Sequence, residues 1–191
     1  MKNENKYFEL VKQASENVSK YVKQWSELHN ERWGEYEATW KALLFHELIL
    51  IDEKLKDNLS MENSLFTKDE QIKGKRMDIW LGPTGNTYAI EVKRIHYNQG
   101  KYGYGIEGLN SQKGVYGDLL KLKDCLATKD VSGVKGIAIA VLSVRGEEDR
   151  DIQVDKIIAK IQQKIFDLIN DDLRLLICSN GKCAYATADT D

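Results

Sequence analysis

Three residues, Asp78, Glu91 and Lys93, have types and spacing that suit binding of a divalent cation. Twelve residues separate the two acids, and both lie in segments that we expect to pair as an antiparallel hairpin. Such a hairpin brings the two carboxylates close together, where they repel unless a cation lies between them. Hard oxygen ligands suit Mg²⁺ or Mn²⁺. Lys93, beside them, is placed to orient a water molecule or to help deprotonate it.

The same residues also have simpler interpretations. Side chains alternate along a strand, so Glu91 and Lys93 share one face and can be an ordinary charge pair exposed to solvent. Asp78 can begin the hairpin or pair with Arg76. Composition alone does not choose between these interpretations and a metal site.

A fourth candidate, Glu47, lies in a segment with helical periodicity. With a turn of about 100° per residue, it falls within a sector of about 60° that also holds Trp40, Leu44 and Ile51. A carboxylate on an apolar stripe needs a cation, a hydrogen-bonding network or a proton. The alternatives are a glutamate at the stripe edge that reaches water, or a buried salt bridge to one lysine.

Together these residues resemble the PD-(D/E)xK nuclease superfamily, which has the restriction-endonuclease-like fold. The resemblance extends over roughly residues 33–144 by the order of elements. Asp78 matches the first acid of the family motif, Glu91 and Lys93 match its Glu-x-Lys pair, and Glu47 matches the acid of the preceding helix. Met77 stands where the motif has its nominal proline.

The resemblance implies a metal-dependent DNA nuclease, expected to be an endonuclease, in which Mg²⁺ activates the attacking water and Mn²⁺ can substitute. Lys93 would position the water and stabilise the developing negative charge. The implied metal ligands are Glu47, Asp78, Glu91 and the main chain of Val92. The implied catalytic residues are Glu47, Asp78, Glu91 and Lys93.

The charge distribution is uneven although the formal net charge is only −2. Residues 73–123 carry a net charge of +5, and the remainder of the chain carries −7. A basic middle segment can present one face to a polyanion, and ordinary solvated lysines are the alternative. Contacts to backbone phosphates predict binding that weakens with salt. The expected nucleic-acid contacts are Arg76, Arg94, Lys101, Lys113 and Lys121.

Accessory residues are expected near the motif. In some family members a helix after the motif strand contributes a polar or basic side chain, and Tyr116, Asp118 and Lys121 are the candidates here. His96 follows the motif strand closely and is a candidate phosphate contact.

The fold class follows from the order of elements. Helices come first, then a hairpin, then alternating helices and strands, which predicts an α/β sandwich with a central mixed sheet flanked by helices. A nearly continuous apolar run at 136–144 is typical of a strand buried on both faces. Helices are expected at 7–28, 35–55, 115–126 and 157–168, and strands at 76–81, 87–95, 136–144, 173–178 and 182–187.

The whole chain of 191 residues suits one compact unit. We expect residues 1–32 to form an N-terminal helical extension and residues 33–191 to form the nuclease-like α/β domain. No apolar stretch is long enough to span a membrane. The N-terminal segment lacks the apolar core of a secretory signal. Three cysteines without metal-type spacing fit reduced thiols in the cytoplasm.

DNA is the expected partner, and a homodimer is an option if both strands are cut. The main alternative is a catalytically silent protein of the same fold that binds nucleic acid or a protein partner, such as a phage or host defence factor. A third interpretation is an interaction protein whose N-terminal helix forms a dimer interface.

Overall fold

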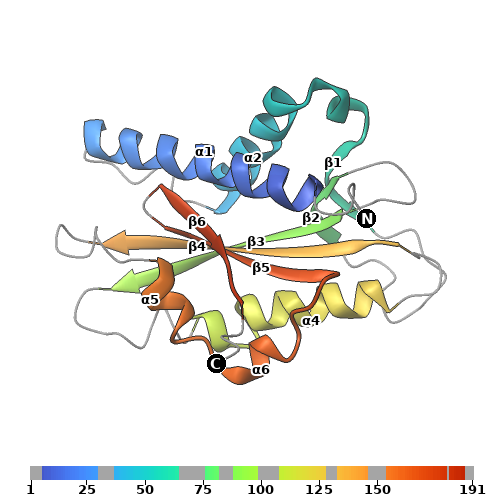
Figure 1. Cartoon of the computed structure of the whole chain (residues 1–191). Coiled ribbons are helices and arrows are strands. Elements are labelled where there is room, and N and C mark those ends of the chain that lie inside the picture. Colours follow the sequence, from blue (N-terminus) through green and yellow to red (C-terminus); the bar gives the residue numbers. More distant parts are fainter. Residues whose placement is uncertain are drawn as a thin grey trace.

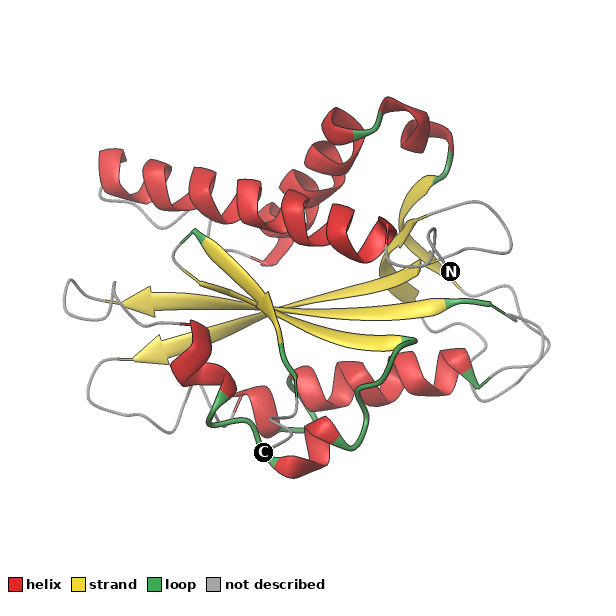
Figure 2. Ribbon diagram, viewed as in Figure 1, coloured by secondary structure: helices red, strands yellow, loops and turns green. Residues whose placement is uncertain are grey.

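A six-stranded mixed β-sheet forms the centre of this computed structural model, and helices cover both of its faces (Figure 1). On one face lie α1 (Lys6–His29) and α2 (Glu37–Ile51), as Figure 2 shows. On the other lie α4 (Val115–Leu126), α5 (Val154–Ile158) and α6 (Gln163–Phe166). The predicted α/β class with a mixed sheet is therefore confirmed.

The structure describes most of the chain. The predicted turn at 82–86, most of the predicted loop at 99–108 and the candidate phosphate contact Lys101 lie outside the described residues. The described residues are 6–29, 37–64, 76–81, 88–98, 108–127, 133–145, 154–179 and 181–187.

The six strands lie side by side in chain order. The first three and the last two pair antiparallel, whereas the third, fourth and fifth run parallel. The expected hairpin of the second and third strands is thus present. The strands are β1 (Leu59–Ser64), β2 (Arg76–Leu81), β3 (Tyr88–Asn98), β4 (Lys135–Arg145), β5 (Leu173–Ser179) and β6 (Lys182–Tyr185).

Strand β4 is buried on both faces, as its apolar run predicts. Ile137 and Ile139 pack into the core beneath α1 and α2, while Ala138 and Ala140 pack into the core on the α4 side. Two separate cores therefore hold the helical layers to one sheet. Small residues on the α4 side let a helix approach the strand closely.

Helix α1 contributes side chains to the core between the sheet and the layer formed by α1 and α2. Phe8, Val11 and Val18 are buried there together with α2 and sheet residues. The apolar side chains of the helix expected at 7–28 are not all buried, because Tyr21 and Trp25 in its second half are 50% and 39% exposed. The division of the chain at residue 32 stays a prediction.

The predicted helix at 35–55 is shorter in the structure. α2 ends at Ile51, and a short 3₁₀ helix, η2 (Glu53–Asp57), follows it. Asp52 makes the break because its carboxylate accepts a hydrogen bond from the backbone N–H of Lys54, as an N-cap does.

Two other elements differ from the expectation. Strand β1, at the edge of the sheet, is not among the expected strands. Its sequence is mostly polar, and its apolar residues are limited to Leu59 and Met61. The single helix expected at 157–168 is instead two short helices, α5 and α6. Ile157, Ile161 and Ile165 are nevertheless buried, although a turn separates the two short helices.

The expectation of three reduced thiols is wrong for two of them. Cys178 and Cys183 form a disulfide, and they are direct cross-strand partners in the β5–β6 hairpin with a Cα–Cα distance of 4.2 Å. Sequence spacing could not reveal that register. Cys125 is buried on α4 and is not part of this bond. Among the described helices, none combines the length and apolar character needed to cross a bilayer.

Candidate active site

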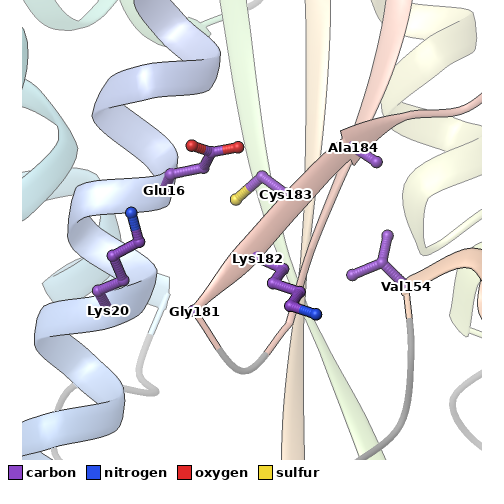
Figure 3. A pocket seen from close by; sticks show the side chains of 7 residues that line it. All are labelled: Glu16, Lys20, Val154, Gly181, Lys182, Cys183 and Ala184. Carbon is purple, nitrogen blue, oxygen red and sulfur yellow. The ribbon is translucent and has the colours of Figure 1, made fainter.

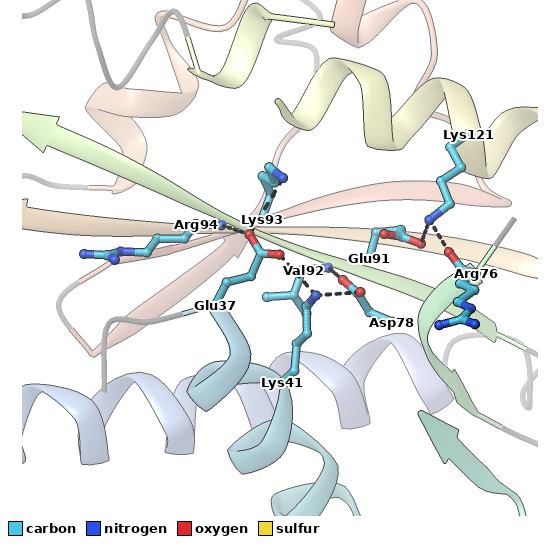
Figure 4. Close-up of polar contacts among 9 residues, drawn as sticks. All are labelled: Glu37, Lys41, Arg76, Asp78, Glu91, Val92, Lys93, Arg94 and Lys121. Carbon is cyan, nitrogen blue, oxygen red and sulfur yellow. Dashed lines mark hydrogen bonds and ion pairs between the residues drawn. The ribbon is translucent and has the colours of Figure 1, made fainter. Parts of the chain in front are cut away.

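Asp78 lies where strands β2 and β3 separate. The pairing between them runs from Leu81 opposite Tyr88 to Ile79 opposite Ile90. One residue further, the Asp78 side chain replaces a backbone acceptor: its Oδ2 accepts a hydrogen bond from the backbone N–H of Val92 at 2.8 Å. This contact fixes the first acid against the backbone of the motif strand (Figure 4).

Glu91 lies on the α4 face of β3 and is almost completely buried. Its side chain is 6% exposed, and its Oε1 is 2.5 Å from Nζ of Lys121 on α4. The same ammonium group donates to the main-chain carbonyl oxygen of Arg76, at the start of β2. Lys121 therefore ties α4 to both strands of the hairpin.

The N-terminal end of α2 approaches the site from the other face of the sheet. Nζ of Lys41 is 2.7 Å from Oδ1 of Asp78 and 3.1 Å from Oε1 of Glu37. Oε2 of Glu37 lies 3.8 Å from Nζ of Lys93 and accepts a hydrogen bond from the backbone N–H of Arg94 at 3.4 Å. Figure 4 shows these groups converging around β3.

The pKa of Glu91 is raised to about 7. Burial is the main cause, and the negative charge of Asp78 adds to it. The bond and the charge of Lys121 act in the opposite direction without cancelling these effects, and Asp118 adds a smaller increase. The negative charge of Asp78 is thus part of the electrostatic environment of Glu91.

Asp118, on α4, also has a raised pKa, at about 6. Burial raises it, and the charges of Lys93 and Lys121 oppose the increase. For Glu37, burial also raises the pKa, but the bond from Lys41 and the charge of Lys93 outweigh burial and hold it below the ordinary value.

Lys41 remains charged despite partial burial. Burial lowers its pKa, but the hydrogen bonds and charges of Asp78 and Glu37 outweigh that effect and hold it above the ordinary value. Its side chain is 13% exposed. The cluster thus combines four acids with three lysines: Glu37, Asp78, Glu91 and Asp118 with Lys41, Lys93 and Lys121.

Glu47, the predicted acid from the preceding helix, faces a different neighbour. Its Oε2 accepts a hydrogen bond from the side-chain amide of Asn17 on α1, at 3.1 Å. The glutamate that α2 contributes to the cluster is Glu37, ten residues earlier, which is about 15 Å along a helix. Glu47 faces away from the cluster because α1 packs along the flank of α2 on which Glu47 lies.

The helix residues Glu37 and Lys41 were missed by reasoning from sequence, although a signal for them exists. They stand four residues apart, and Leu44 and Leu48 continue the helical spacing of three and four residues into the core. A charged pair that extends a buried stripe at its N-terminal end points toward the sheet. Its position beside Asp78 depends on how α2 crosses the sheet.

The predicted phosphate contacts are placed differently from one another. Arg76 and Lys113 have exposed side chains, and Arg94 is half-buried. Lys121 directs its ammonium group to Glu91 and to the Arg76 carbonyl oxygen, which is the placement expected of a basic side chain from the helix after the motif strand, and its phosphate contact stays a prediction.

The accessory candidates lie on β3 and α4. His96 belongs to β3, opposite Ser143 of β4 in the backbone register. Asp118 is part of the cluster through its interactions with Lys93 and Lys121. Tyr116 instead stacks under Lys164, whose Nζ is 4.7 Å from the ring centre.

The donor atoms of Asp78 and Glu91 fit a hard cation. They are carboxylate oxygens, and the negative charge of Asp78 adds to the burial that raises the pKa of Glu91. Within the described part of the chain, no three His, Cys, Asp or Glu side chains gather closely enough to hold a metal ion. Mg²⁺ needs only one or two protein carboxylates because it retains several waters. The two motif acids therefore suit such an ion, and a three-carboxylate site with Glu47 is not formed.

A separate pocket lies at the β6 edge of the sheet, between that strand, α1 and the start of α5 (Figure 3). Its volume is about 490 Å³. Lys20, Lys182, Glu16 and the disulfide-bonded Cys183 line it. It shares no residue with the cluster of acids and lysines.

No protein-family model matches the sequence, and no curated protein matches it. Among solved structures, the chain is similar to SfsA from Pyrococcus furiosus in complex with Ca²⁺, with 14% sequence identity and a TM-score of 0.36. The match covers 77% of this chain and 62% of that one. At these values the similarity assigns neither a family nor a function.

Proposed function

We propose that this protein is a Mg²⁺-dependent hydrolase of phosphodiester bonds in DNA, with a restriction-endonuclease-like sandwich fold. The observation that carries the proposal is the contact between Asp78 and the backbone of Val92. This contact holds Asp78 against β3, the strand that carries both Glu91 and Lys93. This contact supports a site at the point where the two strands separate.

In this proposal Asp78 and Glu91, with the main-chain carbonyl near Val92, would hold Mg²⁺, and Mn²⁺ would substitute. When bound, the ion would act as a Lewis acid toward the phosphate and lower the pKa of the attacking water. Burial of Glu91 keeps bulk water away from its carboxylate and strengthens its interaction with a cation.

Lys93 would orient the water and stabilise the negative charge that develops on the phosphate. Its ammonium group is held 3.8 Å from Glu37. Glu37 is in turn fixed by the Arg94 backbone N–H and by Lys41. Arg76, Arg94, Lys101 and Lys113 would contact backbone phosphates, and positively charged groups of this kind make DNA binding salt-dependent.

The test is to incubate the chain with plasmid and linear DNA in Mg²⁺, in Mn²⁺ and in EDTA. We expect cleavage that EDTA abolishes. Lys93→Ala and Glu91→Gln should each reduce the rate by about a hundredfold or more. Lys135→Met is the matched control, since Lys135 pairs with Asp172 at 2.9 Å outside the cluster. DNA left intact under every metal condition would contradict the proposal.

A second candidate function is a catalytically silent protein that binds nucleic acid or a protein partner. The observation in its favour is that Asp78 and Glu91 each already have a lysine partner. Such a protein should bind labelled DNA equally well in EDTA and in Mg²⁺. Calorimetric titration separates the two candidates, because only a metal-dependent enzyme should bind an ion that Asp78→Ala no longer binds.

We also propose a cytoplasmic location and, if both DNA strands are cut, a homodimer. The disulfide between Cys178 and Cys183 provides a test of the cytoplasmic location, because such bonds are rare in a reducing cytosol. Alkylation of cell extracts followed by mass spectrometry would show whether these two thiols are reduced in the cell. Light scattering at known concentration measures the oligomeric state.

A further inference from the structure

We infer that Lys41 and Lys121 are built-in counter-cations that must release Asp78 and Glu91 before a divalent ion can bind, so that these two lysines set the metal affinity of the site. The inference rests on the proposed function, because it assigns Asp78 and Glu91 as the ligands. Both lysines act through the carboxylates, and they are therefore positioning residues.

Each lysine occupies an oxygen that a metal ion would need. Nζ of Lys41 is 2.7 Å from Oδ1 of Asp78, and Nζ of Lys121 is 2.5 Å from Oε1 of Glu91 (Figure 4). The other oxygen of Asp78 is already bonded to the Val92 N–H. An ammonium group and a divalent cation on the same carboxylate repel each other strongly at such distances, especially where water is largely excluded.

Each lysine also has a second acceptor that is not a proposed metal ligand. Lys41 is 3.1 Å from Oε1 of Glu37, and Lys121 donates to the carbonyl oxygen of Arg76. A partly buried ammonium group is costly to leave without a partner. Because the second acceptors remain in place, each lysine can give up its carboxylate and keep a hydrogen bond.

The two lysines approach from opposite faces of the sheet. Lys41 comes from α2 and Lys121 from α4, and they meet the hairpin at the point where β2 and β3 separate. Each lysine meets one of the two acids, Lys41 meeting Asp78 and Lys121 meeting Glu91.

The test is calorimetric titration of Mn²⁺ into the full chain and into Lys41→Met and Lys121→Met. Methionine keeps most of the side-chain length and removes the charge. We expect each methionine variant to bind Mn²⁺ on the order of tenfold more tightly than the unmodified chain. Lys41→Arg and Lys121→Arg keep the charge and should retain the original affinity. Lys135→Met removes the charge of a lysine paired to Asp172 and controls for the change in net charge.

A methionine variant can be poorly folded without metal, and its melting temperature then provides a second measurement. Ligands that bind only the folded state raise its melting temperature, so Mn²⁺ should raise the Tm of either methionine variant more than that of the unmodified chain. Methionine variants with unchanged or weaker Mn²⁺ affinity, and no larger Tm increase, would overturn the inference.

The failure of this inference differs from the failure of the proposed function. If the unmodified chain binds Mn²⁺ and Asp78→Ala does not, while the methionine variants bind no more tightly, only the inference is wrong. If neither the unmodified chain nor the methionine variants bind Mn²⁺, both are wrong. If only the methionine variants bind it, the inference is supported directly.

Discussion

Oδ2 of Asp78 accepts a hydrogen bond from the backbone N–H of Val92 at 2.8 Å, just beyond the last paired residues of β2 and β3. An aspartate side chain thus completes the hydrogen bonding of a strand whose ladder has ended. The same carboxylate pairs with Lys41 through its other oxygen. Asp78 therefore accepts a hydrogen bond that the sheet backbone leaves unpaired, connects the sheet to α2 through Lys41 and places a negative charge near Glu91.

Asp78→Ala should destabilise the protein by about 1 to 3 kcal/mol, because it leaves the buried N–H of Val92 without an acceptor. Val92 is 1% exposed, so water cannot replace the lost bond readily. Asp78→Asn retains an amide oxygen and should lose less. Urea denaturation of both variants in EDTA measures the difference, and equal losses would contradict the assigned role of this hydrogen bond.

Lys121→Met should cost about 1 to 3 kcal/mol of stability at pH 8 without metal, because it leaves Glu91 buried without its cation. Adding Glu91→Gln to that variant should restore much of the loss, since a neutral amide no longer needs the ammonium group. A double-mutant cycle measured by chemical denaturation gives the coupling. Additive losses would mean that the pair does not contribute to stability.

The stability of the metal-free protein should fall as the pH rises from about 4.5 to about 7. Glu91 has a pKa near 7 in the folded state and an ordinary value near 4.5. The folded state therefore binds its proton more tightly than the unfolded chain does, and this contribution is lost as the proton leaves. Asp118 acts in the same direction up to about pH 6.

The measurement is the melting temperature of the unmodified chain and of Glu91→Gln across this pH range in EDTA. The difference between the two proteins should change in favour of Glu91→Gln as the pH rises. Glu53→Gln is the control, because the Glu53 side chain is 82% exposed. Parallel curves for the unmodified chain and Glu91→Gln would rule out the assigned titration.

Gly117→Ala should disturb the start of α4 and with it Asp118 and Lys121. A Cβ at residue 117 would lie 1.9 Å from the backbone oxygen of Gln112, which cannot move without shifting the helix. We expect a loss of about 1 to 3 kcal/mol, as for other overpacked sites. At Gly108 the nearest atoms to the added Cβ all belong to the Ile95 side chain, with Cγ2 closest at 3.1 Å, so Gly108→Ala should cost less. Thermal denaturation compares the two.

Leu44→Ala should cost about 2 to 5 kcal/mol, because Leu44 is fully buried between α2, α1 and the sheet. Leu50, on the same helix, is 64% exposed. Leu50→Ala should change stability by no more than about 0.5 kcal/mol. Equal effects of the two substitutions would mean that α2 does not pack on the sheet through its Leu44 face.

Local patterns were sufficient to predict several elements of this protein. The apolar run of β4 needs two buried faces wherever the strand lies in the sheet, and the order of elements favours a mixed α/β arrangement. The spacing of Asp78 and Glu91 across a short connection places them on neighbouring strands. These features depend on residues close together in the chain, so the sequence alone could predict them.

The tertiary structure decided which groups surround those acids. Glu37 rather than Glu47 reaches the cluster because α1 packs against one flank of α2, and no local pattern reports that packing. Lys121 forms an ion pair with Glu91 because α4 packs against β3 at that point. Cys178 lies opposite Cys183 because of the β5–β6 register. These contacts join residues far apart in the chain or depend on strand register, and they form only when two apolar cores fix the helices on the sheet.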